Sequence, residues 1–133
     1  MNLEPRAIAE RCSAAAYDGT LDFPAIVGAL VEAGFEGYDV DYRCGNATYF
    51  LAGGDHVRVS LPPSEGVVAP VFDASVVADA VREAQTQAPG YTYRGFCKKV
   101  KAAGCAGYMV SFLGKRVVYF GRTGETHVEH FPR

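Results

Sequence analysis

Several features that mark other protein classes are missing from this chain of 133 residues. No apolar run approaches the roughly 20 residues that a membrane-spanning helix needs. The N-terminus carries Glu4 and Glu10 but no apolar stretch followed by a cleavage site, so no signal peptide is expected. No glycine-rich phosphate loop, nucleophile elbow or paired-carboxylate spacing is present. We therefore expect a cytoplasmic protein without a membrane partner or a cofactor, and non-catalytic by default.

Cysteine pairs of the CxxC type are also missing. The four cysteines are Cys12, Cys44, Cys97 and Cys105. Their positions do not recur between the two halves of the chain, and we expect reduced, buried side chains rather than disulfides or metal ligands. Hydrophobic residues make up 49% of the chain and charged residues 21%, which excludes a disordered composition.

What the chain does contain is an internal repeat, in which residues 23–62 return as residues 93–132 at a constant offset of 70. Most shared residues are glycines and aromatics, and glycine marks backbone positions that other residues fit poorly. The first copy has Ala33-Gly34, Gly37-Tyr38, Val40, Tyr49-Phe50, Gly54 and Pro62, and the second has Ala103-Gly104, Gly107-Tyr108, Val110, Tyr119-Phe120, Gly124 and Pro132.

Each copy is predicted to fold as helix–helix–strand–strand–strand. The candidate helix caps are Asn2, Asp22, Asp73 or Ser75, and Thr92. The predicted strands are 38–42, 47–51, 56–61, 106–112, 115–121 and 126–131. The sequence thus predicts one α+β domain over residues 1–133, with repeats at about 1–62 and 70–133 and pseudo-twofold symmetry. Whether the antiparallel strands form one sheet or two packed sheets stays open.

The small net charge of −2 hides an uneven split between the halves. Residues 1–66 hold 4 Lys and Arg against 10 Asp and Glu, whereas residues 67–133 hold 9 against 5, which gives −6 and +4. The helix at 23–33 is apolar nearly all round, which predicts burial on more than one side. Both features make a homo-oligomer possible, with opposite charges pairing between chains.

The C-terminal segment from Val118 to Pro132, VYFGRTGETHVEHFP, resembles the signature of the YbcV-like proteins. Residues 18–24 (DGTLDFP) and 102–108 (AAGCAGY) are similar to that family as well. These are small bacterial and prophage proteins that are often labelled phage-envelope-like. The resemblance covers most of the chain, but it implies no activity and supplies no catalytic residues, because the family has no assigned function.

The first candidate site is the segment Glu125-Thr126-His127-Val128-Glu129-His130. In a strand, Glu125, His127 and Glu129 share one face, and two carboxylates beside an imidazole can bind a divalent metal or orient a general base. His56 lies at the matching turn of the first copy and is a possible further ligand. A solvated strand face is the alternative interpretation.

The second candidate is a basic set on the helix before Gly104. Its members are Arg94, Lys98, Lys99 and Lys101. A one-sided basic surface can follow phosphates, but the pI of about 5.9 lies far from that of typical nucleic-acid binders, so nucleic acid is an unlikely partner. The third candidate is a ligand cavity lined by Tyr38, Tyr49, Tyr108 and Tyr119, whose alternative is cross-strand core packing.

Taken together, the sequence favours a non-catalytic binding module for a partner protein or a small ligand. One alternative is a small metal-dependent enzyme that uses His127 with Glu125 and Glu129. A further alternative is a nucleic-acid-associated prophage protein that uses the basic second half.

Overall fold

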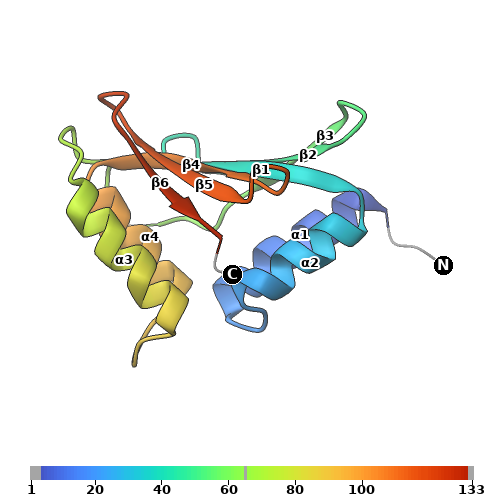
Figure 1. Cartoon of the computed structure of the whole chain (residues 1–133), viewed down its shortest axis with the longest axis horizontal. Helices are drawn as coiled ribbons and strands as arrows, with labels where there is room; N and C mark the ends of the chain where they lie inside the picture. The colour runs from blue at the N-terminus through green and yellow to red at the C-terminus, as the bar shows by residue number, and fades with distance from the viewer. Residues whose placement is uncertain (1–3, 65, 132–133) are drawn as a thin grey trace.

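The computed structural model describes residues 4–64 and 66–131, which form four α-helices and six β-strands (Figure 1). The first copy contains α1 (Pro5–Asp18), α2 (Phe23–Glu32), β1 (Phe35–Asp41), β2 (Asn46–Leu51) and β3 (His56–Ser60). The second copy contains α3 (Ala74–Thr86), α4 (Tyr93–Ala102), β4 (Cys105–Ser111), β5 (Arg116–Gly121) and β6 (Thr126–His130). The α+β class and the repeated order are confirmed, and α2 to β3 return as α4 to β6 at the offset of 70.

Side-chain caps begin three of the helices at the predicted places. The Asp22 carboxylate accepts a hydrogen bond from the Ala25 N–H at 3.0 Å, and the Thr92 hydroxyl accepts one from the Gly95 N–H at the same distance. Asp73 caps α3 by accepting from two backbone N–H groups. These bonds satisfy donors that the first helical turn leaves without partners. The expected cap Asn2 lies outside the described residues.

All six strands belong to one antiparallel sheet with the order β3-β2-β1-β4-β5-β6. The two copies therefore meet edge to edge, where β1 pairs with β4. In this seam Tyr38 lies opposite Val110, and Val40 lies opposite Tyr108. Because each pair maps onto the other at an offset of 70, a pseudo-twofold axis passes through the pair between them, Asp39 and Met109.

Two repeated glycines allow this seam to close. A Cβ atom on Gly37 would lie 2.4 Å from the Val110 carbonyl oxygen, and one on Gly107 would lie 2.2 Å from the Val40 carbonyl oxygen. Real Cβ atoms do not approach a carbonyl so closely, so any other residue would push the central strands apart. The sequence repeats glycine at these two positions because each copy presents the same close contact to the other.

The helices form a second layer that covers only one face of the sheet, with α1 and α2 under one half and α3 and α4 under the other (Figure 1). The core lies between the layers and is mostly apolar. Its largest fully buried side chains are Leu30, Val77, Val100, Val110, Cys12 and Cys105. As expected, three of the four free cysteines are buried, whereas Cys44 is exposed.

Three local predictions need correction. Helix α2 buries Ile26 and Leu30 but leaves Val31 51% exposed, so it is covered on one side rather than all round. Strand β1 begins at Phe35, three residues before the predicted start, because its first residues pair across an irregularity with β2. Lys115 lies in a turn with a φ of 50° rather than in β5.

Candidate functional site

A polar pocket lies where the two copies and their connection meet. It has a volume of about 240 Å³ and is lined by the end of α1, the β1–β2 turn, residues 61–64 and 66 of the connection, and one side of α4. Its polar side chains are Tyr17, Tyr42, Arg43, Cys44, Ser64, Cys97 and Lys101. We call this cavity the Lys101 pocket.

Helix α4 contributes Cys97 and Lys101, which lie four residues apart and so share one helix face. Lys101 is only 4% exposed, and its Nζ donates a hydrogen bond to the Ser64 hydroxyl at 2.7 Å. The corresponding residue in the first copy, at the offset of 70, is Val31, which is half exposed. The second copy therefore buries a charged side chain where the first exposes an apolar one.

The hydroxyl of Tyr42 donates a hydrogen bond to the Cys97 sulfur at 3.5 Å. Burial raises the pKa of the Cys97 thiol above its usual value, and burial also raises the pKa of the Tyr42 hydroxyl. Near neutral pH both groups therefore stay protonated. The pocket wall thus combines the positively charged side chains of Lys101 and Arg43 with a protonated thiol at Cys97 and a protonated hydroxyl at Tyr42.

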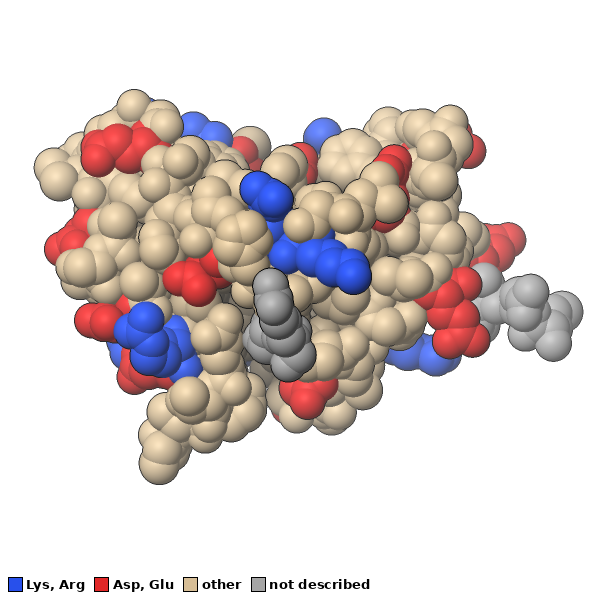
Figure 2. Space-filling view, viewed as in Figure 1, with Lys and Arg blue, Asp and Glu red and all other residues tan. Residues whose placement is uncertain are grey.

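The predicted basic set on α4 does not form one surface. Lys101 lines the pocket and is only 4% exposed, because it shares a helix face with the buried Cys97. Lys99 pairs with Glu83 on α3 at 2.5 Å, and the Arg94 guanidinium lies over the Tyr17 ring, 5.3 Å from its centroid. Lys98 is exposed. On the face that Figure 2 shows, basic and acidic side chains are interspersed with large uncharged areas.

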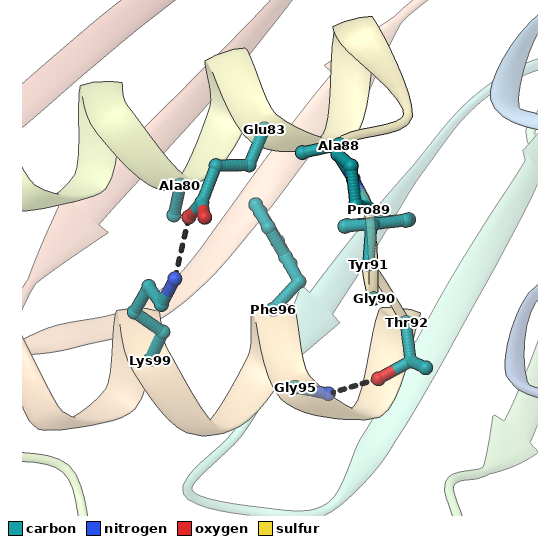
Figure 3. A pocket seen from close by; sticks show the side chains of 10 residues that line it. All are labelled: Ala80, Glu83, Ala88, Pro89, Gly90, Tyr91, Thr92, Gly95, Phe96 and Lys99. Carbon is teal, nitrogen blue, oxygen red and sulfur yellow. Dashed lines mark hydrogen bonds and ion pairs between the residues drawn. The ribbon is translucent and has the colours of Figure 1, made fainter.

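A second pocket lies between α3 and α4, with a volume of about 130 Å³ (Figure 3). Small residues line much of it, the Phe96 ring points into the space between the helices, and the Glu83–Lys99 ion pair closes one end. Tyr91 and Thr92 come from the loop before α4. This space is smaller and lacks a buried charge, so it is the weaker candidate.

The four tyrosines of the predicted ligand cavity are buried in the core. They contact one another through their rings, with centroids 5.0 Å apart for Tyr38 and Tyr49 and 5.4 Å apart for Tyr108 and Tyr119. None of the four lines either pocket described above. Tyr108 also shares a 2.5 Å hydrogen bond with the hydroxyl of Tyr93.

The predicted metal ligands are only partly brought together. His127 Nε2 lies 2.5 Å from Glu129 Oε2, and both side chains are 24% exposed. Glu125 precedes β6 and is exposed, and His56 lies on β3 at the opposite edge of the sheet. Within residues 4–64 and 66–131, no group of three or more His, Cys, Asp or Glu side chains is arranged to hold a metal ion.

His127 and Glu129 also do not lie on a solvated outer face. The His127 ring contacts the core ring of Tyr119, with centroids 6.4 Å apart. The same positions in β3 are Val57 and Val59, which are buried on the helix side of the sheet. The second copy thus carries two polar side chains on the inner face of its edge strand.

Sequence reasoning missed Tyr17, Ser64 and Cys97 as site residues. Cys97 is expected to be buried, and Lys101 lies one helical turn later on the same face. The spacing of Cys97 and Lys101 along the helix was the sequence signal available for the pocket. Tyr17 and Ser64 reach it from distant parts of the chain, so no local pattern marks them.

Comparison with known proteins gives a family but no activity. No helix among the described residues is long and apolar enough to cross a membrane. No curated protein matches the chain. The profile of a family described as protein of unknown function, DUF1398, matches residues 15–129 and so spans both copies of the repeat. The chain therefore belongs to the DUF1398 family of proteins of unknown function.

Proposed function

We propose that this protein is a non-catalytic binding module and that its ligand is a small organic anion held in the Lys101 pocket. The volume of about 240 Å³ lies below the roughly 300–1,000 Å³ of pockets for drug-sized ligands, so the ligand is metabolite-sized. Lys101 supplies positive charge, and the Tyr17 and Tyr42 rings with Leu61 supply apolar walls.

The observation that carries this proposal is the burial of Lys101. Its Nζ donates a hydrogen bond to the Ser64 hydroxyl at 2.7 Å, which holds the ammonium group at the pocket wall. Here only 4% of Lys101 is exposed, while the corresponding Val31 is 51% exposed. A ligand carboxylate or phosphate at this wall would gain a charge-assisted hydrogen bond in a partly desolvated site.

The chemistry of Cys97 and Tyr42 supports binding rather than catalysis. The raised pKa values of Cys97 and Tyr42 keep a thiol and a hydroxyl at the wall, and both are hydrogen-bonding groups rather than nucleophiles. Arg43 stands at the rim, where it pairs with Asp41 at 3.1 Å. It can assist the entry of an anion without being buried itself.

The test is a thermal-shift screen of the purified chain against small carboxylates and small phosphate esters, followed by calorimetric titration of each hit. A ligand at 100 times its Kd stabilises the fold by about 2.7 kcal/mol, which raises Tm by something on the order of 10 °C. We expect Lys101→Met to abolish the shift. Lys98→Met is the matched control, because it removes the same charge from the exposed part of the same helix.

Two results would refute the proposal. One is that neither ligand class raises Tm, and the other is that Lys101→Met binds a hit as tightly as the parent while remaining folded. Carboxylate hits without phosphate hits, or the reverse, would identify which anion the pocket takes.

The other functional interpretations receive less support. A phosphate-following surface on α4 is weakened because Lys99 is paired with Glu83 and Lys101 is buried. The resemblance to YbcV-like proteins suggests a phage-related role, which is kept as a proposal. This role indicates neither a ligand nor a reaction. A cytoplasmic location is likewise a proposal.

A further inference from the structure

The inner face of β6 is polar where the symmetry of the fold calls for an apolar surface. In β3, Val57 and Val59 are buried against the helix layer, whereas β6 has His127 and Glu129 at the matching positions. Half-buried polar side chains on a sheet face need partners. His127 and Glu129 contact each other at 2.5 Å, so the two groups already converge on one point.

The backbone of β6 shows which groups remain available at its edge. The Gly121 N–H donates to the Glu125 carbonyl, and the Phe131 N–H donates to the Lys115 carbonyl. In an antiparallel ladder, residues alternate between bonding toward one neighbour and toward the other side. The N–H and C=O groups of Thr126, Val128 and His130 therefore point away from β5 toward the outer edge of the sheet.

We propose that two copies of this chain pair through β6 and that His127 and Glu129 of both copies together bind a divalent transition metal such as Zn²⁺. Antiparallel pairing centred on Val128 places Val128 opposite its counterpart and Thr126 opposite His130 of the second copy. Every outward backbone group of β6 then gains a partner.

The same register aligns the polar side chains on the inner face. His127 of one copy lies opposite Glu129 of the other, and the reverse pair follows from the twofold symmetry. These are non-hydrogen-bonded positions, where opposing Cα atoms approach to about 4.5 Å. Two imidazoles and two carboxylates on neighbouring strands provide the four nitrogen and oxygen ligands that zinc binds. One chain alone provides only half of this set, in agreement with the lack of a three-ligand group in the described residues.

The opposite edge of the sheet does not suit the same pairing. The central residue of β3 is Arg58, so twofold pairing there would place two like charges opposite each other. In addition, the Arg58 carbonyl accepts a hydrogen bond from Arg6 Nη1 at 3.2 Å, which occupies one edge group. On the outer face, by contrast, Val128 continues the row of Met109 and Val118 across three strands. Pairing through β6 would extend this apolar row into the second copy.

The experiment uses the full chain after chelator treatment, with light scattering for mass and elemental analysis for metal content, before and after addition of ZnCl₂. We expect the mass to double from 14.2 kDa and one zinc ion to bind per two chains. His127→Ala and Glu129→Gln should each lose both effects, since each variant removes two of the four ligands. His56→Ala on the opposite edge is the control and should behave like the parent chain.

Two further variants test the edge pairing itself. Val128→Pro removes an outward N–H, leaving the bonds to β5 in place, and Val128→Lys places two charges at the centre of the seam. Both should stay monomeric with zinc while keeping the parent circular dichroism spectrum. The proposal is overturned if zinc binds one ion per chain without a change of mass, or if zinc has no effect on mass. Zinc-induced dimerisation of the His127→Ala variant would overturn the proposal equally. The proposal of a shared metal at β6 does not depend on the Lys101 pocket.

Discussion

Replacing Gly104 with alanine should destabilise the fold far more than the same change at Gly34, its equivalent in the first copy. Both glycines end a helix with a positive φ, 89° at Gly104 and 98° at Gly34. An alanine at either position is strained, at a cost of about 1–2 kcal/mol, and reducing the freedom of the unfolded chain offsets about 0.4–1 kcal/mol of it. The backbone contribution is therefore nearly the same in the two variants.

The surroundings of the two glycines differ. A Cβ atom on Gly104 would lie 2.0 Å from the Val71 carbonyl oxygen and 2.8 Å from the Phe72 Cα, both of which are backbone atoms. A Cβ atom on Gly34 would meet only the tip of Leu51, at 3.7 Å. Relieving the clash at Gly104 requires the connection between the copies to move, and overpacking of this kind costs about 1–3 kcal/mol or more. We expect Gly104→Ala to lose at least about 2 kcal/mol more stability than Gly34→Ala.

Urea unfolding followed by circular dichroism measures this difference from the transition midpoints, provided that the slopes agree. If the two variants lose the same free energy of unfolding within about 0.5 kcal/mol, the reasoning is refuted, because the connection would then make no steric contact that an alanine at position 104 disturbs. The variant also reports on the Lys101 pocket. The Ala69 N–H donates to the Lys101 carbonyl at 3.0 Å, so a displaced connection should weaken ligand binding as well.

Three further predictions concern the titration of two sheet carboxylates and one hydrogen bond between α4 and the sheet. Burial raises the pKa of Asp39, so its ionisation opposes folding; Asp39→Asn should raise Tm at pH 7 and have little effect near pH 3. Burial also disfavours the ionised form of Asp41, but hydrogen bonds from the Arg43 side chain and from the backbone outweigh this effect and lower the pKa of Asp41. The ionised carboxylate therefore stabilises the fold, and Asp41→Asn should lower Tm at pH 7. This loss of Tm should vanish as the pH falls below about 4. A Tm difference independent of pH in either variant would contradict the assignment. Tyr93→Phe and Tyr108→Phe should each lower the free energy of unfolding in urea by about 1–3 kcal/mol, because each leaves the other hydroxyl without its 2.5 Å partner. The double variant should lose less than the sum of the two single losses. Strict additivity of the losses would disprove the coupling.

Much of the fold could be predicted because the residues that mark the ends of helices and the strands occur in both copies of the repeat. The Ala-Gly pair that ends α2 and α4 and the Gly-Tyr pair in β1 and β4 placed the same elements at the same offset. The choice between one sheet and two was not predictable. It depends on pairing between residues 35–41 and 105–111, and the alternation of apolar residues is the same in either arrangement.

The candidate sites were less predictable because each depends on which side of an element faces the core. Alternation correctly placed His127 and Glu129 on one face, but it did not identify that face as the inner one. The buried Val57 and Val59 of the first copy supply the missing information once the copies are aligned. The burial of Lys101 is hard to predict because a charged residue on a helix usually marks the exposed side, and only its spacing from Cys97 indicates the buried side.

Divergence between the copies distinguishes the positions that the shared fold requires from the positions of the proposed sites. Gly37 and Gly107 stay identical because each must admit a carbonyl of the other copy, and this need is symmetric. The proposed sites break the symmetry. Lys101 is buried where Val31 is exposed, and His127 lies where Val57 is fully packed. Because the first copy shows that the fold accepts valine at both places, the fold itself does not require a lysine at 101 or a histidine at 127. These two positions are therefore the ones at which a ligand and a shared metal are proposed.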